Sequence, residues 1–170
     1  MARIACGDAQ AFRRLVDRHA GWGVSFVERM VGARADAEDL VQTAFLRVWQ
    51  GAAKWEPAAR FRTWFYRVLY NLCMDHFRAN AEPTEDLDEE LPDGQPSVED
   101  RYAALQRADR VRAAIAALPA RQRAAIVLCY YQELPQADAA ATLGVSEGAL
   151  ESLLSRGRAA LRKSMQHELH

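Results

Sequence analysis

Aromatic and basic side chains alternate between residues 54 and 80 in a pattern that suits contact with nucleic acid. The segment KWEPAARFRTWFYRVLYNLCMDHFRAN holds seven aromatic residues and five lysines or arginines. Aromatic rings offer flat surfaces on which unpaired bases stack, and cations neutralise phosphates, so the segment suits opened, single-stranded nucleic acid. The alternative is that most of these rings fill the protein core, which would leave about two or three of them free.

A second candidate surface lies near the C-terminus, in GVSEGALESLLSRGRAALRK, residues 144–163. Small Ala140 allows close helix packing, Leu143 points inward, Gly144 can adopt the left-handed conformation, and Ser146 can cap the following helix. These features predict a helix-turn-helix. Many small bundles join two helices at a glycine without touching DNA, so a structural role is the alternative.

The last predicted helix has one apolar face, which is formed by Leu150, Leu154, Gly157 and Leu161. The residues left on the outside are Glu151, Ser152, Ser155, Arg156, Arg158, Arg162 and Lys163. The early acids, Glu147 and Glu151, have two interpretations. They can stabilise the positive end of the helix dipole, or Glu151 can accept a hydrogen bond from a cytosine amino group in the major groove.

Residues typical of catalysis are missing from the sequence. It contains no glycine-rich phosphate loop and no nucleophile elbow, and its four histidines lie near no plausible triad partners. Cys73 and His76 form one CxxH pair, which is more typical of a buried cysteine on a helix face than of half a metal site. The three cysteines support neither a disulfide framework nor a zinc site. We therefore expect no enzymatic activity, no metal and no cofactor.

These candidate surfaces must be positioned by helices, because apolar residues recur at spacings of three and four and no strand pattern occurs. The net charge of −1 divides into +4 for residues 1–80, −9 for residues 81–100 and +4 for residues 101–170. The acidic segment is rich in proline and contains no aromatic residue, which is typical of a flexible linker. The fold class expected is all-α, with two small helical domains, 1–80 and 101–170, joined by an acidic flexible linker.

The helices predicted in the first domain are 8–20, 22–32, 36–52 and 61–79, with breaks near Gly21 and Gly32. Those predicted in the second domain are 99–117, 120–132, 135–143 and 146–165, with Pro119 and Pro135 suited to first turns.

The apolar arc of the helix in DAEDLVQTAFLRVWQ, residues 36–50, is wider than one packed face requires. One interpretation is a central helix with neighbours on two sides. The other is that Gln42, Leu46 and Trp49, at i, i+4 and i+7, face a partner protein.

The N-terminal residues lack the apolar core of a signal peptide, and the longest apolar run, residues 124–131, is too short to span a bilayer. We expect a cytoplasmic protein without membrane insertion.

The whole chain resembles a bacterial sigma factor of the extracytoplasmic-function (ECF) group. GDAQAF and DAEDLVQTAFLRVW resemble the polymerase-binding part of sigma region two, and FRTWFYRVLYNLCMDHFR resembles its promoter-melting and minus-ten-reading part. LPARQR, LGVS and SRGRAALR resemble region four. The resemblance implies binding to the β′ clamp and β flap of core RNA polymerase, to promoter DNA, and to an anti-sigma factor.

The resemblance also implies roles for particular residues. Core polymerase would be bound by Asp36, Glu38, Asp39, Gln42, Leu46 and Trp49. The minus-ten element would be bound by Lys54, Trp55, Arg60, Arg62, Trp64, Arg67, Asn71 and Arg78. The minus-thirty-five element would be bound by Ser146, Glu151, Ser152, Ser155, Arg156, Arg158, Arg162 and Lys163.

Two other functions fit parts of the sequence: a sigma-like adaptor kept for protein contacts, and a plain helix-turn-helix regulator that acts without polymerase. The aromatic and basic segment favours a sigma factor, because a regulator that binds only duplex DNA has no use for base-stacking surfaces in a second domain.

Overall fold

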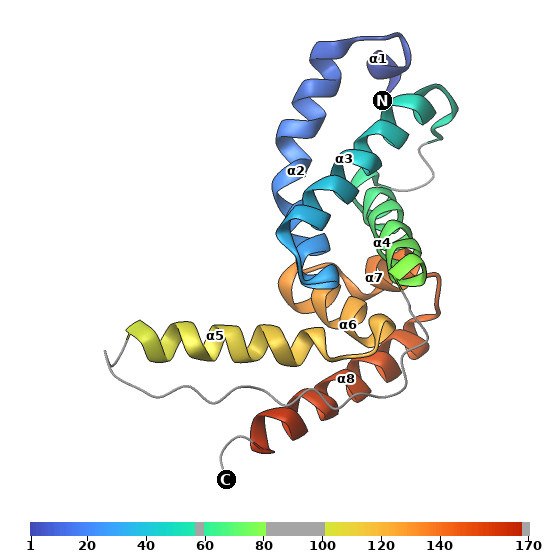
Figure 1. Cartoon of the computed structure of the whole chain (residues 1–170). Coiled ribbons are helices and arrows are strands. Elements are labelled where there is room, and N and C mark those ends of the chain that lie inside the picture. Colours follow the sequence, from blue (N-terminus) through green and yellow to red (C-terminus); the bar gives the residue numbers. More distant parts are fainter. Residues whose placement is uncertain (57–59, 81–100, 168–170) are drawn as a thin grey trace.

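The structure is a computed structural model that describes residues 1–56, 60–80 and 101–167, and these residues form helices and no strand (Figure 1). The predicted all-α class is therefore confirmed, as is the division into two helical parts. The acidic segment 81–100, predicted to be a flexible linker, lies outside the described residues.

Three long helices build the first part: α2 (Ala9–Val31), α3 (Arg34–Gly51) and α4 (Phe61–Asn80). A short helix, α1 (Ala2–Ala5), and a 3₁₀ turn, η1 (Ala52–Lys54), pack together at the end where the chain starts. The long helices bury a core rich in aromatic rings, with Phe26, Phe65 and Tyr66 completely inaccessible to solvent. This core positions the outer faces of α3 and α4.

Helix α2 is bounded by the residues that its sequence suggests. The Asp8 carboxylate accepts a 2.8 Å hydrogen bond from the amide of Ala11, and Gly32 ends the helix with a φ of 86°. The predicted break near Gly21 is wrong, because α2 continues through it. An exposed glycine costs a helix only about 1 kcal/mol, and burial of the residues that follow it, Gly23 and Val24, outweighs that cost.

The second part consists of α5 (Arg101–Ala116), α6 (Ala120–Ile126), a π-helical segment η2 (Val127–Tyr131), α7 (Gln136–Leu143) and α8 (Glu147–His167). Pro119 and Pro135 each stand immediately before a helix. The prediction of one regular helix over 120–132 is wrong in its second half, because the α-helix widens into a π-helical segment after Ile126.

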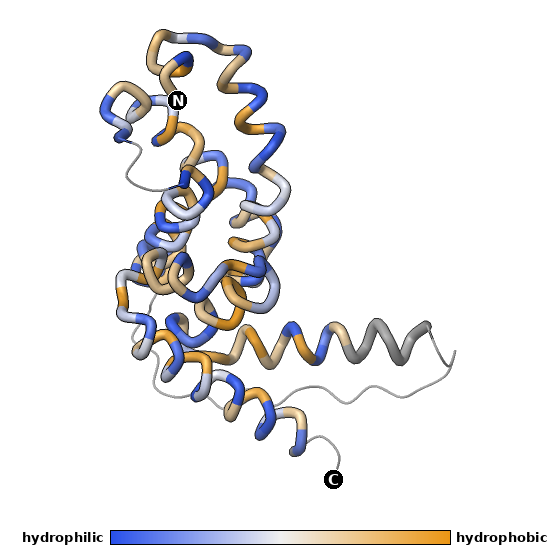
Figure 2. The backbone as a smooth tube through the Cα atoms, turned by 180° about the vertical axis from the view of Figure 1, so that it is seen from behind, coloured by the Kyte–Doolittle hydropathy of each residue, from blue (hydrophilic) through white to orange (hydrophobic). Residues whose placement is uncertain are grey.

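The turn between α7 and α8 has the predicted form. Gly144 adopts a φ of 65°, Leu143 is buried, and the Ser146 hydroxyl accepts a 3.2 Å hydrogen bond from the amide of Ala149. Gly157 lets α8 approach α6 closely, since a Cβ there would lie 3.0 Å from Cγ1 of Ile126. In Figure 2 the tube of α8 alternates between hydrophilic and hydrophobic residues, as expected for a helix that packs on one side.

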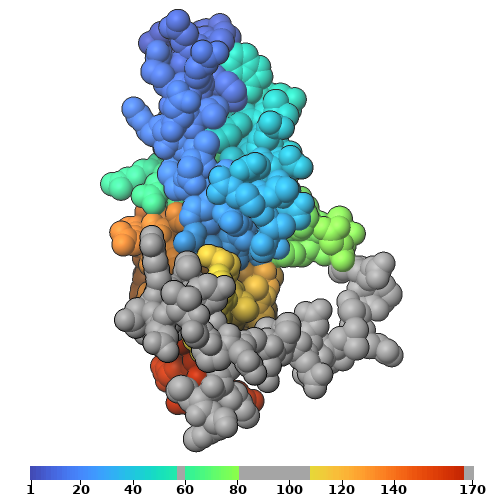
Figure 3. All heavy atoms as spheres, turned by 60° about the vertical axis from the view of Figure 1, so that its left-hand side comes forward, coloured from blue at the N-terminus to red at the C-terminus, as the bar shows by residue number. Residues whose placement is uncertain are grey.

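The two parts pack against each other. Helix α7 lies on α4, and α2 contacts α5, α6 and η2. In the space-filling view, yellow and orange atoms of the second part lie directly against the blue atoms of the first part (Figure 3). Sequence analysis predicted the two parts but not their contact.

Candidate nucleic-acid and protein interfaces

The row formed by Gln42, Leu46 and Trp49 lies on the exposed side of α3. The side chain of Leu46 is 54% exposed and that of Trp49 is 37% exposed, with its ring 5.0 Å from that of Phe12. The buried side of α3 is formed by other residues, namely Ala37, Val41, Ala44, Phe45 and Val48. Leu46 and Trp49 are therefore surface residues rather than the interior of the bundle.

An apolar groove of about 340 Å³ runs between α2 and α3 beside this row. Its lining is formed by Phe12, Val16, Ala20, Val24, Glu38, Val41, Gln42, Phe45 and Leu46. A concave apolar surface with two polar residues at its margin suits the apolar face of a partner helix.

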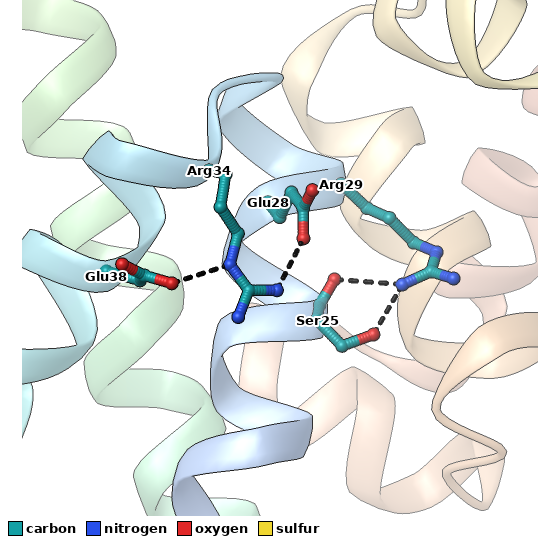
Figure 4. A network of polar contacts seen from close by, with 5 residues as sticks. All are labelled: Ser25, Glu28, Arg29, Arg34 and Glu38. Atoms are coloured by element: carbon teal, nitrogen blue, oxygen red, sulfur yellow. Dashed lines mark hydrogen bonds and ion pairs between the residues drawn. The ribbon is translucent and has the colours of Figure 1, made fainter. Parts of the chain in front are cut away.

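The three acids predicted to bind polymerase, Asp36, Glu38 and Asp39, are exposed at the start of α3. Arg34 joins this helix to α2, because its guanidinium lies 2.7 Å from the Glu38 carboxylate and 3.2 Å from that of Glu28 (Figure 4). Arg29, in the last turns of α2, instead donates to the backbone carbonyl and hydroxyl of Ser25. Two of the three acids thus remain outside this ion-pair network.

Five of the residues predicted to bind the minus-ten element form one row along α4. At 100° per residue, Arg60, Trp64, Arg67, Asn71 and Arg78 fall within a narrow arc of the helix surface. The four polar members are exposed and Trp64 is half-buried. Arg78 also pairs with Asp75 at 2.6 Å. We call these five residues the α4 row.

Arg62 lies on the opposite side of α4 from this row. Its guanidinium donates a 2.9 Å hydrogen bond to the backbone carbonyl of Gln132 in the second part. The other two predicted residues precede α4: Lys54 is exposed at the end of η1, and Trp55 follows it half-buried. The structure therefore brings five of the eight residues together and separates Arg62 from them.

The aromatic rings between residues 54 and 80 mostly serve the core. Phe65, Tyr66 and Tyr70 are buried, while Trp55, Phe61, Trp64 and Phe77 are half-buried. Phe61 and Trp64 lie 5.7 Å apart near His19, whose imidazole pKa is lowered by burial and by the nearby Arg18 and Arg62. The half-buried rings retain surface that solvent reaches.

The residues predicted to bind the minus-thirty-five element lie along α8, where all but Ser146 belong to the helix and all are exposed. Several already have local partners. The Ser152 hydroxyl donates to the carbonyl of Gly148 at 3.0 Å, and Arg158 donates to the phenol of Tyr130 at 2.9 Å. Arg156 donates to the carbonyl of Ser152 at 3.3 Å.

Arg123 and Gln132 join the two parts, and sequence reasoning missed both. Arg123 is half-buried in α6; its guanidinium donates to the backbone carbonyls of Met30, Ala116 and Leu118, and burial lowers its pKa. Gln132 is buried and accepts the bonds from Arg62 and Tyr66. No local pattern could have identified them, since their partners in the first part lie 66 to 93 positions away.

The CxxH pair has surroundings unlike those of a metal site. Cys73 is completely buried, and burial raises the pKa of its thiol to about 12. The His76 imidazole is half-buried beside Asn80 and Asp36. No group of three histidine, cysteine, aspartate or glutamate side chains that could hold a metal occurs among residues 1–56, 60–80 and 101–167. No helix within the same described residues is both long and apolar enough to cross a membrane.

The sequence of the chain matches two family models. Residues 15–82 match sigma-70 region 2, and residues 108–161 match sigma-70 region 4. A helical domain that ends in the α4 row, followed by a helix-turn-helix domain, is therefore of the sigma-70 class.

Individual relatives identify the group of sigma-70 proteins to which the chain belongs. The chain is 35% identical over 164 residues to the ECF RNA polymerase sigma factor SigM of Mycobacterium tuberculosis, covering 96% of this chain and 81% of SigM. It is 30% identical to the ECF RNA polymerase sigma factor SigW of Bacillus subtilis, covering 96% of this chain and 94% of SigW.

A solved structure agrees with these relatives. CnrH of Cupriavidus metallidurans, in complex with the cytosolic domain of CnrY, is similar with a TM-score of 0.73 and 29% identity, covering 98% of this chain and 94% of CnrH. The chain belongs to the ECF RNA polymerase sigma factors. It is a transcription initiation factor that binds core RNA polymerase and promoter DNA, and it is not an enzyme.

Proposed function

We propose that the first part, residues 1–80, binds core polymerase through α3 and contacts the minus-ten element through the α4 row. The assignment of minus-ten binding to α4 rests on the α4 row. Three cations, one amide and one half-buried indole follow a single line along α4, on the side away from Arg62. Such a line suits a strand of DNA, whose phosphates attract the cations while an unpaired base stacks on Trp64.

The test compares two faces of the same helix. Arg67→Ala combined with Asn71→Ala removes the centre of the α4 row, whereas Arg62→Ala removes a cation from the opposite face. Promoter opening by the full chain and core polymerase is measured with a fluorescent base analogue in the minus-ten element. The double variant should open the promoter at least about tenfold less, and Arg62→Ala should open it nearly normally. Equal loss in both would contradict the assignment of this face.

Core polymerase should bind at the exposed row and groove of α3. Leu46 and Trp49 are large apolar side chains beside an apolar groove, a combination typical of residues that contribute most to an interface. Run-off transcription with purified core polymerase tests the activity as a whole. A plain helix-turn-helix regulator would give no transcript in that assay, and a sigma-like adaptor would bind polymerase without directing initiation.

The second part should read the minus-thirty-five element through α8. Gly144 and Ser146 set the start of α8, and its exposed C-terminal half carries Arg156, Arg158, Arg162 and Lys163. These cations supply attraction to phosphates, while residues nearer the start of the helix face base edges. The acidic segment 81–100 would then connect two DNA-binding parts that act in the cytoplasm.

An anti-sigma factor should compete with polymerase for the groove between α2 and α3. The groove is open, and its lining residues are mostly aliphatic or aromatic. A helix that buries its apolar face there would cover Leu46, which the polymerase also needs under this proposal. Core polymerase and a candidate anti-sigma protein should exclude each other on the wild-type chain, and Leu46→Asp should weaken the binding of each when they are measured separately. Simultaneous binding of both to the wild type would contradict the shared site.

A further inference from the structure

Helix α8 carries two exposed glutamates, Glu147 and Glu151, and neither has a hydrogen-bond or ion-pair partner among the described residues. Glu151 is exposed and forms no hydrogen bond or ion pair with any other described residue. It lies in the N-terminal half of α8, the half that contacts base edges in a helix-turn-helix. A free carboxylate on a surface that must approach phosphates weakens binding unless it meets a donor.

The neighbours of Glu151 on α8 are either too short to reach a base or already hydrogen-bonded. Gly148 and Ala149 are too short to reach far into a groove. Ser152 donates its hydroxyl to a backbone carbonyl of its own helix, at 3.0 Å. Farther along, Arg158 is held by the phenol of Tyr130 at 2.9 Å. The Glu151 carboxylate is therefore available on this surface to accept a hydrogen bond.

A purely structural role fits Glu147 better than Glu151. Glu147 lies in the first turn of α8, next to the Ser146 cap, where the positive end of the helix dipole favours an acid. Glu151 lies one turn later, and the effect of the dipole falls off beyond the first turn. The two glutamates thus form a matched pair on one helix, with the same chemistry and different surroundings.

We propose that Glu151 selects a cytosine in the minus-thirty-five element by accepting a hydrogen bond from the cytosine N4 amino group. This inference rests on the proposed function of α8. In the major groove, guanine offers only acceptors at this edge and thymine offers the O4 acceptor, so both repel a carboxylate. Adenine offers a donor beside its N7 acceptor, which makes it the weaker match. Glu151 therefore acts as a specificity-determining residue at one base pair.

The experiment uses the full chain bound to core polymerase and a promoter library randomised over the minus-thirty-five element. The wild-type protein is compared with Glu151→Gln, Glu151→Lys and the matched control Glu147→Gln. At one position the wild type should prefer cytosine over thymine roughly tenfold. Glu151→Gln should relax that preference, Glu151→Lys should move it toward guanine, and Glu147→Gln should leave it unchanged. Thermal unfolding of each variant checks that all four proteins are folded.

Three results would overturn the proposal. If Glu151→Gln and Glu151→Lys rank the bases as the wild type does, Glu151 reads no base. If Glu151→Lys binds every sequence more tightly with the same ranking, Glu151 only weakens attraction to phosphates. If the wild type itself shows no preference across the randomised segment, α8 reads no sequence, and the proposed function of the second part fails with the inference.

Discussion

The phenol of Tyr66 donates a 2.7 Å hydrogen bond to the side-chain Oε1 of Gln132, which joins α4 to the turn before α7. Tyr66 is completely buried and Gln132 is 7% exposed. Burial also raises the pKa of the Tyr66 phenol, so the group stays protonated and donates. The bond therefore links the two parts of the chain in a place that water does not reach.

Tyr66→Phe should destabilise this contact. The substitution keeps the ring and removes the donor, which leaves a buried amide oxygen unpaired at a cost of about 1–3 kcal/mol. Urea unfolding measures the loss, and small-angle scattering detects any separation of the two parts. Tyr70→Phe is the matched control, because it removes a hydroxyl of the same helix that forms no hydrogen bond with any described residue. Equal effects of the two substitutions would show that the hydrogen bond adds nothing to the free energy of unfolding.

Leu46→Ala should weaken binding to core polymerase by more than about 1 kcal/mol while the helices stay intact. The side chain is 54% exposed, so its removal leaves little cavity. Trp49→Ala should weaken binding similarly, with some additional loss of stability because its ring packs on Phe12. The control is Val48→Ala, a buried neighbour that should lose stability first. Parallel loss of binding and stability in Leu46→Ala would contradict an interface role.

Cys73 should make the protein less stable in alkaline solution. Its thiol has a pKa of about 12 in the folded protein, against 9.0 for an unperturbed thiol, because burial disfavours the thiolate. Above that lower value the unfolded chain releases a proton that the folded chain keeps, so the free energy of unfolding falls as the pH rises. The slope should be roughly 1 kcal/mol per pH unit between the two values.

The measurement is urea unfolding from pH 8 to about 11 for the wild type and Cys73→Ala. Tyrosines and lysines titrate in the same range, so the quantity to compare is the difference between the two curves. Below an unperturbed thiol pKa the difference should be constant, and above it the wild type should lose stability faster. A constant difference throughout would mean that Cys73 ionises normally.

Glu133→Gly should stabilise the turn before α7. Glu133 has a φ of 51°, the only positive φ of a non-glycine residue among the described residues. A left-handed conformation costs a residue with a Cβ roughly 1–2 kcal/mol, part of which glycine loses again through the freedom of the unfolded chain. We expect a net gain of about 0.5–1 kcal/mol in urea unfolding. Glu133→Ala removes the charge but keeps the Cβ, and it should give no such gain.

Local features of the sequence were enough to predict where most of the long helices lie and the turn of the helix-turn-helix. Gly32, Gly144 and Ser146 act on their own neighbours, so their effects can be read from adjacent residues. The break predicted near Gly21 failed because packing on both sides of that residue outweighs its low helix propensity. Exposure of Leu46 and Trp49 was one of two interpretations, and the width of the apolar arc alone could not decide between them.

The candidate site was predictable where its residues share one helix. The α4 row follows from spacing alone, once the helix is known. The position of Arg62 on the opposite face follows from the same spacing, but its hydrogen bond to Gln132, which is 70 residues away in the chain, does not. The same is true of Arg123, whose acceptors belong to three different segments. Contacts of this kind come from the packing of whole helices rather than from any local pattern.

Both arginine bonds across the contact between the two parts end on main-chain oxygens, those of Met30 and Gln132. A carbonyl is present whatever side chain its residue carries, so the sequence around these acceptors is free to diverge while the bonds persist. These hydrogen bonds require the donors Arg62 and Arg123 and the paired side chains of Tyr66 and Gln132. Hybrid proteins that exchange one part with a distant relative should therefore keep these hydrogen bonds when those four residues are supplied and the apolar packing of α4 on α7 is preserved.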